Sequence, residues 1–299
     1  MRREERMAAQ LVAELLGYRP EAFLKVRRMG GITNENYYLA TENEELMLRL
    51  PGQCTELIDR AQEEQNAQVA ARAGLNPETL YFSAETGIKI TRYISGARAL
   101  TSEMAAQPEL MTRTAALLHR LHWGLPAFEN RFDPQALFSA YLEPEYDRLA
   151  VVFENLEGAR ATFFDVCAAL EEMQPPLCPC HNDPLAENLV LDSTDRLWLI
   201  DWEYSGQNDP FWDVAAHLLE SEFTPVQQQR FLREYLGRPA TREEQRRVLL
   251  LQIAQDLLWS VQTMVKTLAG EDQFDYAKGR YVRAGRLLAV YRGMYGALS

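Results

Sequence analysis

The pattern of apolar and polar positions predicts short strands and two helices in the first hundred residues. In residues 5–16 the apolar side chains fall on one stripe, which predicts an amphipathic helix. Residues 46–50 alternate instead: leucines face one side, while Met47 and Arg49 face the other, as in a strand with one buried face. A second helix is predicted over residues 58–73. Further strands are predicted over residues 23–29, 37–40, 80–82 and 88–94.

Longer helical patterns dominate from residue 101 onward, with two short strands expected at residues 189–191 and 197–200. Strands and few helices followed by a mostly helical part predict an α+β fold with two unequal lobes. We place the boundary near residues 94–97, so the predicted domains are an N-terminal lobe, 1–95, and a C-terminal lobe, 96–299. The helices are predicted over residues 102–123, 134–153, 158–173, 225–235, 242–268 and 274–295.

Charge narrows the possible partners. The chain has 43 acidic residues against 31 Lys and Arg, a net charge of -12. This balance argues against nucleic acid as the main partner, because such binding relies on Lys and Arg neutralising phosphates. An acidic protein suits a small cationic ligand, although an acidic surface also serves solubility alone.

The sequence predicts neither a membrane span nor a secreted protein. We find no apolar run of the roughly 18 residues that a spanning helix needs. The basic start of the chain continues into an amphipathic helical pattern rather than a signal peptide. Four cysteines in 299 residues do not indicate a disulfide framework. We therefore expect a cytoplasmic protein with no membrane partner.

The candidate chemistry lies in residues 180–203. Turn-forming residues 192–195 separate two short apolar strands, so a hairpin would return Asp201 to the same end as Asn188. Asp183 lies five positions before Asn188, in a loop that contains a proline. Mg²⁺ prefers such carboxylate and amide oxygens together with nucleotide phosphates. Each acid alone could simply cap a turn, but the ordered set favours a metal-dependent site.

These motifs resemble a known family. The sequence HND at residues 181–183 with Asn188, and DWEY at residues 201–204, is similar to the catalytic and metal-binding segments of choline/ethanolamine kinases and aminoglycoside phosphotransferases. The following NDPFWDVA at residues 208–215 is especially like the bacterial choline kinase branch. The resemblance extends over nearly the whole chain and implies a two-lobed protein-kinase-like fold and phosphoryl transfer from ATP.

The resemblance also implies roles for individual residues. Asp183 would orient the substrate hydroxyl and accept its proton, and His181 would give structural support. Asn188 and Asp201 would hold Mg²⁺ on the ATP phosphates. Asp213 would support the catalytic loop by accepting backbone hydrogen bonds. An acid near the start of a helix, stabilised by the helix dipole, explains Asp213 equally well.

A glycine pair between two predicted strands is a candidate phosphate cover. Gly30 and Gly31 allow close approach of the backbone to a phosphate, and Thr33 and Asn34 add donors. Alone this is an ordinary turn, and it lacks the Gly-Lys-Ser/Thr of a Walker loop. Beside the downstream motifs it resembles the nucleotide-covering loop of choline kinases.

Other nucleotide contacts follow from the same resemblance. Arg49 stands where protein kinases have a strand lysine on the phosphates, and a guanidinium can bind phosphate oxygens bidentately. Glu63 fits the spacing of its ion-pair partner best, with Glu64 as the neighbouring alternative. Adenine would bond the backbone near Tyr93 and Ile94, in a segment that a plain linker between lobes would also explain.

Aromatic residues suggest which alcohol is phosphorylated. A quaternary ammonium has no N–H, so aromatic faces and carboxylates must bind it. The resemblance implies that Tyr204, Trp259 and Tyr276 line such a pocket, although core packing explains each aromatic taken alone. Glu203 is a candidate for binding the substrate cation or for supporting the metal site. The chain departs from the family at Gln262, where a second Trp is frequent.

Several alternatives remain open at this point. Ethanolamine, thiamine or an aminoglycoside could replace choline, although a polycationic aminoglycoside would favour acids over aromatics. A zinc protein is conceivable from His119, His122, Cys178 and Cys180, but one residue between cysteines is unlike the usual zinc spacing of about two to four. A binding protein that has lost catalysis is disfavoured because Asp183 and both metal-ligand candidates are present.

Overall fold

The computed structural model describes residues 2–29, 34–52 and 55–298, so the predictions for Gly30, Gly31 and Thr33 lie outside the described residues. The chain forms two compact units, Met1–Thr101 with Ala186–Ser205, and Ser102–Leu185 with Gly206–Ser299. The expected division at residue 95 follows chain order, whereas segment Ala186–Ser205 joins the first unit because its strands pair with residues there.

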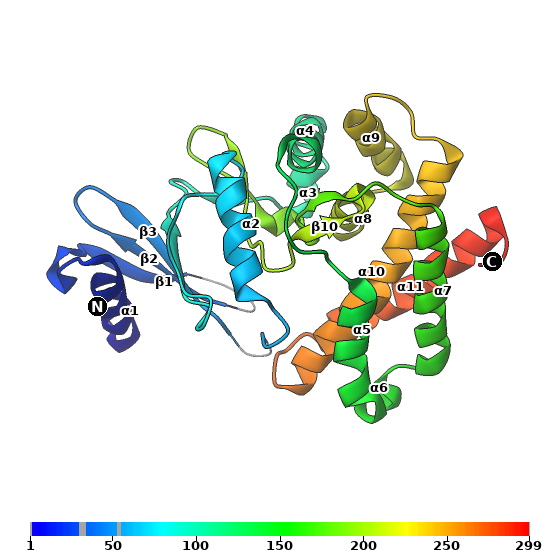
Figure 1. Ribbon diagram of the computed structural model, residues 1–299, viewed down its shortest axis with the longest axis horizontal. Coiled ribbons are helices and arrows are strands. Elements are labelled where there is room, and N and C mark those ends of the chain that lie inside the picture. The colour runs from blue at the N-terminus through cyan, green and yellow to red at the C-terminus, as the bar shows by residue number, and fades with distance from the viewer. Residues whose placement is uncertain (1, 30–33, 53–54, 299) are drawn as a thin grey trace. The chain divides into compact units, whose positions relative to one another are not determined.

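The first unit contains a five-stranded antiparallel sheet in the order β1-β2-β3-β5-β4, of which β1, β2 and β3 are labelled in Figure 1. A second, three-stranded sheet has the order β6-β8-β9. Helices α1 (Arg3–Leu16) and α2 (Arg60–Arg72) and the short η1 (Pro20–Ala22) and η3 (Ala186–Asn188) complete it. The strands are β1 (Lys25–Met29), β2 (Glu35–Ala40), β3 (Glu45–Leu50), β4 (Thr79–Phe82), β5 (Lys89–Arg92), β6 (Arg98–Ala99), β8 (Leu189–Leu191) and β9 (Leu197–Leu199).

Alternation along the strands determines which face of the large sheet is buried. Leu46 and Leu48 of β3 are fully buried in a core that includes Val12 of α1. Because side chains alternate across a strand, the intervening Met47 and Arg49 lie on the opposite face. That face therefore carries polar and sulfur-containing side chains toward a cavity instead of a second apolar core.

The second unit is mostly helical. Its helices are α3 (Ser102–Ala105), α4 (Pro108–Gly124), α5 (Pro134–Leu142), η2 (Glu143–Glu145), α6 (Tyr146–Val152), α7 (Leu156–Glu172), α8 (Pro210–Glu220), α9 (Pro225–Leu236), α10 (Arg242–Leu268) and α11 (Phe274–Tyr295). Its strands β7 (Cys178–Cys180) and β10 (Gly206–Asn208) pair antiparallel.

Prolines account for two differences from the predicted helices. The helix expected over residues 102–123 begins again at Pro108, which occupies the first turn of α4. The helix expected over residues 134–153 is interrupted at η2, which contains Pro144. Helix α8 and strands β6, β7 and β10 were not predicted, because they are short or buried on all sides.

Helix α10 is long and apolar enough by composition to cross a membrane, with a mean hydropathy of 1.3 in its most apolar window. Polar residues such as Gln252 and Asp256 interrupt its apolar positions, so the helix contains no uninterrupted apolar run of that length. However, 89% of the window is buried within the protein, where α10 packs against α5, α7, α8 and α11 (Figure 1). This burial is typical of the core helix of a soluble protein.

Candidate active site

The loop that follows β7 is held by one buried carboxylate. Asp213 of α8 accepts hydrogen bonds from the backbone N–H groups of His181 at 2.8 Å and Asn182 at 2.7 Å. Asn182 has a left-handed φ of 68°, a conformation that Asn adopts more readily than most residues other than glycine. Asp213 therefore fixes the turn immediately before Asp183, and it does so from a fully buried position.

Two further residues of α8 contact the same loop, and sequence reasoning missed both. Trp212 Nε1 donates to Asn182 O at 3.1 Å, and His217 Nδ1 lies 3.2 Å from Pro184 O. Burial lowers the pKa of His217 to about 4, so its ring is neutral and donates through Nδ1 at neutral pH. Asp213 and His217 are four positions apart on one helix face, a spacing that could have indicated a shared partner.

A buried cluster near this loop resembles a metal site without needing a metal. Ligand atoms of His122, Cys180 and Asp213 lie within 4.8 Å of one another. His122 Nε2 is 3.0 Å from Asp213 Oδ2, and its Nδ1 is 2.7 Å from the Tyr235 hydroxyl. Both ring nitrogens and both Asp213 oxygens thus already have hydrogen-bond partners, so these contacts explain the cluster without the zinc considered above.

The hairpin of β8 and β9 brings Asn188 and Asp201 to the same end. Ile200 N donates to Asn188 O at 2.9 Å, so Asn188 is bonded to the residue that directly precedes Asp201. Asp201 has a left-handed φ of 68°, and its side chain is 35% exposed. The amide oxygen of Asn188 and the partly exposed carboxylate of Asp201 form a donor set that suits Mg²⁺ bound to phosphates.

A buried carboxylate on α2 is surrounded by three cations. Glu63 Oε1 lies 2.6 Å from Arg49 Nη1 and 3.5 Å from Lys89 Nζ. Its other oxygen, Oε2, lies 2.6 Å from Arg60 Nη1. Burial alone would raise the pKa of Glu63, but Arg49, Lys89 and Arg60 outweigh it and lower that pKa to about 2. The neighbouring Glu64 instead accepts a hydrogen bond from its own helix.

Arg60 and Lys89 were missed by sequence reasoning. Lys89 stands directly opposite Arg49 in the β3–β5 pairing, and burial lowers its pKa. Alternation along β5 could have placed Lys89 beside Arg49, but only after the two strands were known to pair. Arg60 also reaches Glu203 at 3.3 Å.

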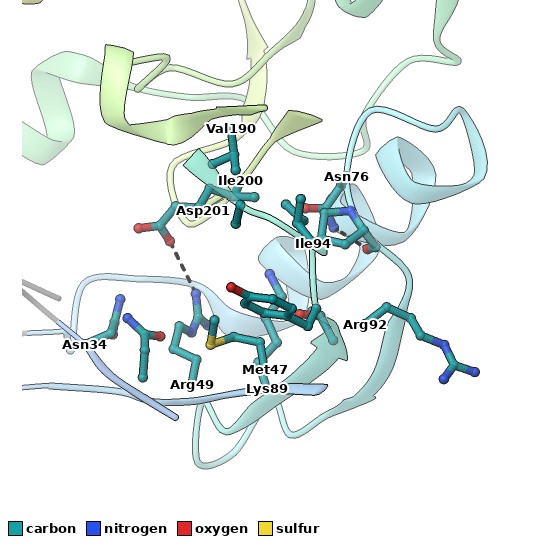
Figure 2. A pocket seen from close by; sticks show the side chains of 15 residues that line it. Asn34, Met47, Arg49, Asn76, Lys89, Arg92, Ile94, Val190, Ile200 and Asp201 are labelled. Atoms are coloured by element: carbon teal, nitrogen blue, oxygen red, sulfur yellow. Dashed lines mark hydrogen bonds and ion pairs between the residues drawn. The ribbon is translucent and has the colours of Figure 1, made fainter. Parts of the chain in front are cut away.

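A cavity of about 180 Å³ lies within the first unit (Figure 2). Val190 and Ile200 line one side, and Met47, Arg49 and Lys89 of the sheet line the other. Arg49 Nη1 donates to Asp201 Oδ1 at 3.3 Å across it. The remaining lining residues are Asn34, Asn36, Asn76, Pro77, Thr91, Arg92, Tyr93, Ile94, Ala97 and Asp201.

Unused hydrogen-bonding groups around the cavity suit a polar ligand. Among the described residues, Asn34 Oδ1 and Arg49 Nε are buried without a hydrogen-bond partner. The Tyr93 N–H donates to Glu45 O. Buried polar groups are normally paired, so Asn34 Oδ1 and Arg49 Nε are positions at which a polar ligand could bind.

The candidate substrate residues are divided between the two units. Glu203 and Tyr204 belong to the first unit, and Trp259 and Tyr276 belong to the second. Trp259 is buried on α10, and Gln262 lies one turn further along the same helix. The Tyr276 hydroxyl donates to Glu220 at 2.5 Å and accepts from Arg280 at 2.6 Å, and the residue as a whole is 46% exposed.

Comparison with known proteins identifies the family. The sequence profile described as "Phosphotransferase enzyme family" matches residues 26–249. The chain belongs to this family. It is 32% identical to "Protein LicA" of Haemophilus influenzae over 269 residues, which cover 87% of this chain and 78% of that protein. The chain is therefore a phosphotransferase, the enzyme class that the motifs at residues 181–204 predicted.

Two solved structures confirm the protein-kinase-like fold of the phosphotransferase. The crystal structure of choline kinase LicA from Streptococcus pneumoniae has a TM-score of 0.83 and 32% identity, covering 97% of this chain and all of that chain (100%). A crystal structure of LicA in complex with AMP matches with the same TM-score, 0.83, and coverage of 97% and 100%.

Proposed function

We propose that this phosphotransferase transfers the γ-phosphate of ATP, with Mg²⁺, to the hydroxyl of choline or a similar amino alcohol. The observation that carries the proposal is the cavity in which Arg49, paired with Glu63, reaches Asp201. The AMP complex of LicA supports a nucleotide as its occupant. The relation to choline kinase LicA supports an amino alcohol as the acceptor.

Phosphoryl transfer asks the protein mainly for positioning and for neutralisation of charge. We assign Asp183 to orient the acceptor hydroxyl and take up its proton. Arg49 binds phosphate oxygens, and the Ile94 backbone binds the base. Asn188 and Asp201 hold the Mg²⁺, which when bound offsets the negative charge of the phosphates.

The glycine turn of Gly30, Gly31, Thr33 and Asn34 covers the nucleotide in this proposal. His181 and Asp213 support the loop that carries Asp183. The N-terminal lobe thus has the nucleotide-covering role, and the C-terminal lobe has the catalytic and substrate-binding role.

The acceptor is a small cation in this proposal. Aromatic faces of Tyr204, Trp259 and Tyr276 attract a quaternary ammonium by cation–π contacts worth roughly 0.5–2 kcal/mol each. Of the two roles that the sequence suggests for Glu203, binding the substrate cation and supporting the metal site, its contact with Arg60 favours the second. The net charge of -12 suits a cationic substrate and disfavours nucleic acid. We further propose a cytoplasmic protein without a membrane partner; the burial of α10 and the free, buried Cys167, Cys178 and Cys180 support this proposal.

A substrate panel tests the proposal. Choline, ethanolamine, thiamine and kanamycin are offered with ATP and Mg²⁺, and ADP release is followed by a coupled assay. We expect the highest kcat/KM with choline; activity on kanamycin alone would overturn the choice of acceptor.

The variant Asp183→Asn tests the role of Asp183. It should abolish turnover while binding ATP as tightly as the unaltered protein. Near-normal turnover in that variant would remove Asp183 from the role of base.

A further inference from the structure

Helix α2 contacts the segment of residues 201–205 at two separate points. Arg60 Nη1 lies 3.3 Å from Glu203 Oε2. Further along the helix, Asn66 Nδ2 donates to both the backbone oxygen and the hydroxyl of Ser205, at 3.1 Å each. Arg60 and Asn66 are six residues apart, so their backbone positions are separated by about 9 Å along the helix axis, at roughly 1.5 Å per residue. Two contacts from separate turns of one helix restrain the orientation of the segment as well as its position.

Arg60 is itself held firmly. It is the first residue of α2, directly after Asp59, whose side chain caps the helix by accepting from two backbone N–H groups. Its side chain is 8% exposed and also pairs with Glu63 at 2.6 Å. A Cβ at Gly87 would lie 3.1 Å from Arg60 Nε, so the glycine leaves just enough room for this side chain. The Arg60 side chain is therefore restrained by its contacts and can position the neighbouring segment of residues 201–205.

The restrained segment is one that needs support. Asp201 adopts a left-handed φ of 68°, a conformation that costs free energy for a residue other than glycine. The side chain of Glu203 is 7% exposed, and burial together with Asp201 raises its pKa to about 7. Arg49 and Arg60 oppose this rise. Arg60 Nη1 donates to Glu203 Oε2 at 3.3 Å, and this contact fixes the chain two residues after Asp201.

We propose that Arg60 is a positioning residue for the metal ligand Asp201, acting through its ion pair with Glu203. Asn66 assists it through Ser205. This inference rests on the proposed function, since it takes Asp201 as a ligand of Mg²⁺. It assigns Glu203 to support of the Asp201 turn, one of the two roles that its sequence position had suggested. Partners that orient metal ligands typically change metal affinity by about 10- to 100-fold when removed.

The test measures nucleotide binding by calorimetry, with and without Mg²⁺. In Arg60→Met, Glu63 keeps Arg49 and Lys89 as partners, and the turn loses its cation. We expect ATP affinity in the presence of Mg²⁺ to fall by about tenfold or more, while Mg²⁺-free ATP binding changes less than about twofold. Glu203→Gln should reproduce the loss, and Arg60→Lys should restore part of it. The matched control is Arg72→Met, an exposed arginine at the end of the same helix, which should match the unaltered protein.

The double variant Arg60→Met with Glu203→Gln separates positioning from general damage. If the two residues act as one pair, the double variant loses little more Mg²⁺-dependent affinity than the worse single variant. Equal losses of affinity with and without Mg²⁺, or no loss in Arg60→Met, would overturn the inference while leaving the proposed function standing. If Arg60→Met does not fold, Glu203→Gln alone decides between these outcomes. An unaltered protein that binds no ATP with Mg²⁺ would overturn both proposals.

Discussion

The support of the catalytic loop by Asp213 leads to a quantitative prediction. Asp213 is fully buried and accepts from His181 N, Asn182 N and His122 Nε2 at 2.8, 2.7 and 3.0 Å. In Asp213→Asn, an NH₂ group replaces one carboxylate oxygen, so at least one buried donor loses its acceptor. An unsatisfied buried donor costs about 1–3 kcal/mol, and the remaining bonds weaken because their acceptor is no longer charged.

We therefore expect Asp213→Asn to lower the free energy of unfolding by about 3 kcal/mol, against about 5–15 kcal/mol for a typical domain. The variant should thus still fold. Displacement of the loop should also lower kcat by about 10- to 100-fold, since each 1.36 kcal/mol of lost transition-state stabilisation is about tenfold in rate. Urea unfolding followed by circular dichroism gives the first quantity, and coupled ADP release gives the second.

Asp192→Asn is the matched control for this experiment. Asp192 accepts from Thr194 N at 2.8 Å and Arg196 N at 2.9 Å in the β8–β9 turn, at the end of the hairpin away from Asp201. Replacing this carboxylate by an amide should lower the free energy of unfolding and leave kcat within about twofold of that of the unaltered enzyme. The reasoning on Asp213 fails if its variant keeps normal kcat, or if both variants lose kcat equally.

Three further predictions concern stability. Burial lowers the pKa of His217 to about 4, so the stability from its neutral form is present above its ordinary pKa of 6.5 and is lost as pH falls from 6.5 toward 4, by at most about 3 kcal/mol. Urea unfolding at pH 7 and pH 5 should show about 2 kcal/mol of this loss, and His217→Gln should lack it. Burial disfavours the charge of Lys89, so Lys89→Met should leave the free energy of unfolding in urea equal or higher. Arg49→Met should lower that free energy, because Glu63 loses its partner at 2.6 Å. A lower free energy of unfolding for Lys89→Met would contradict this reasoning. Gly96 has a φ of 69°, and an added Cβ would lie 2.9 Å from Ser193 Cβ. Gly96→Ala should therefore lower the free energy of unfolding by about 1–3 kcal/mol in the same urea assay. An unchanged urea midpoint of unfolding would refute the argument.

Local chemistry made some features readable from the sequence. Leucines alternating with Met47 and Arg49 determined which face of β3 is buried, because successive side chains of a strand point to opposite faces. Helices α10 and α11 begin and end where their patterns predicted. Thr241 caps α10 together with Glu244, a signal that lies within four residues of sequence.

The surroundings of Glu63 required the tertiary structure. Helix α2 is weakly amphipathic, so its pattern could not show whether Glu63 or Glu64 faces inward. Arg49, Arg60 and Lys89 come from three different elements, and their convergence on one carboxylate depends on strand pairing and on the placement of α2.

The sequence by itself determined the α+β class, the faces of the strands and the order of the candidate catalytic residues, since these depend on residue spacing. Only the tertiary structure placed residues 186–205 with the N-terminal unit, through pairing such as Arg98 with Leu191. Backbone hydrogen bonds are alike in every residue, so sequence does not reveal which distant strands pair. The partners that orient Asp183 and Asp201 are therefore consequences of the fold.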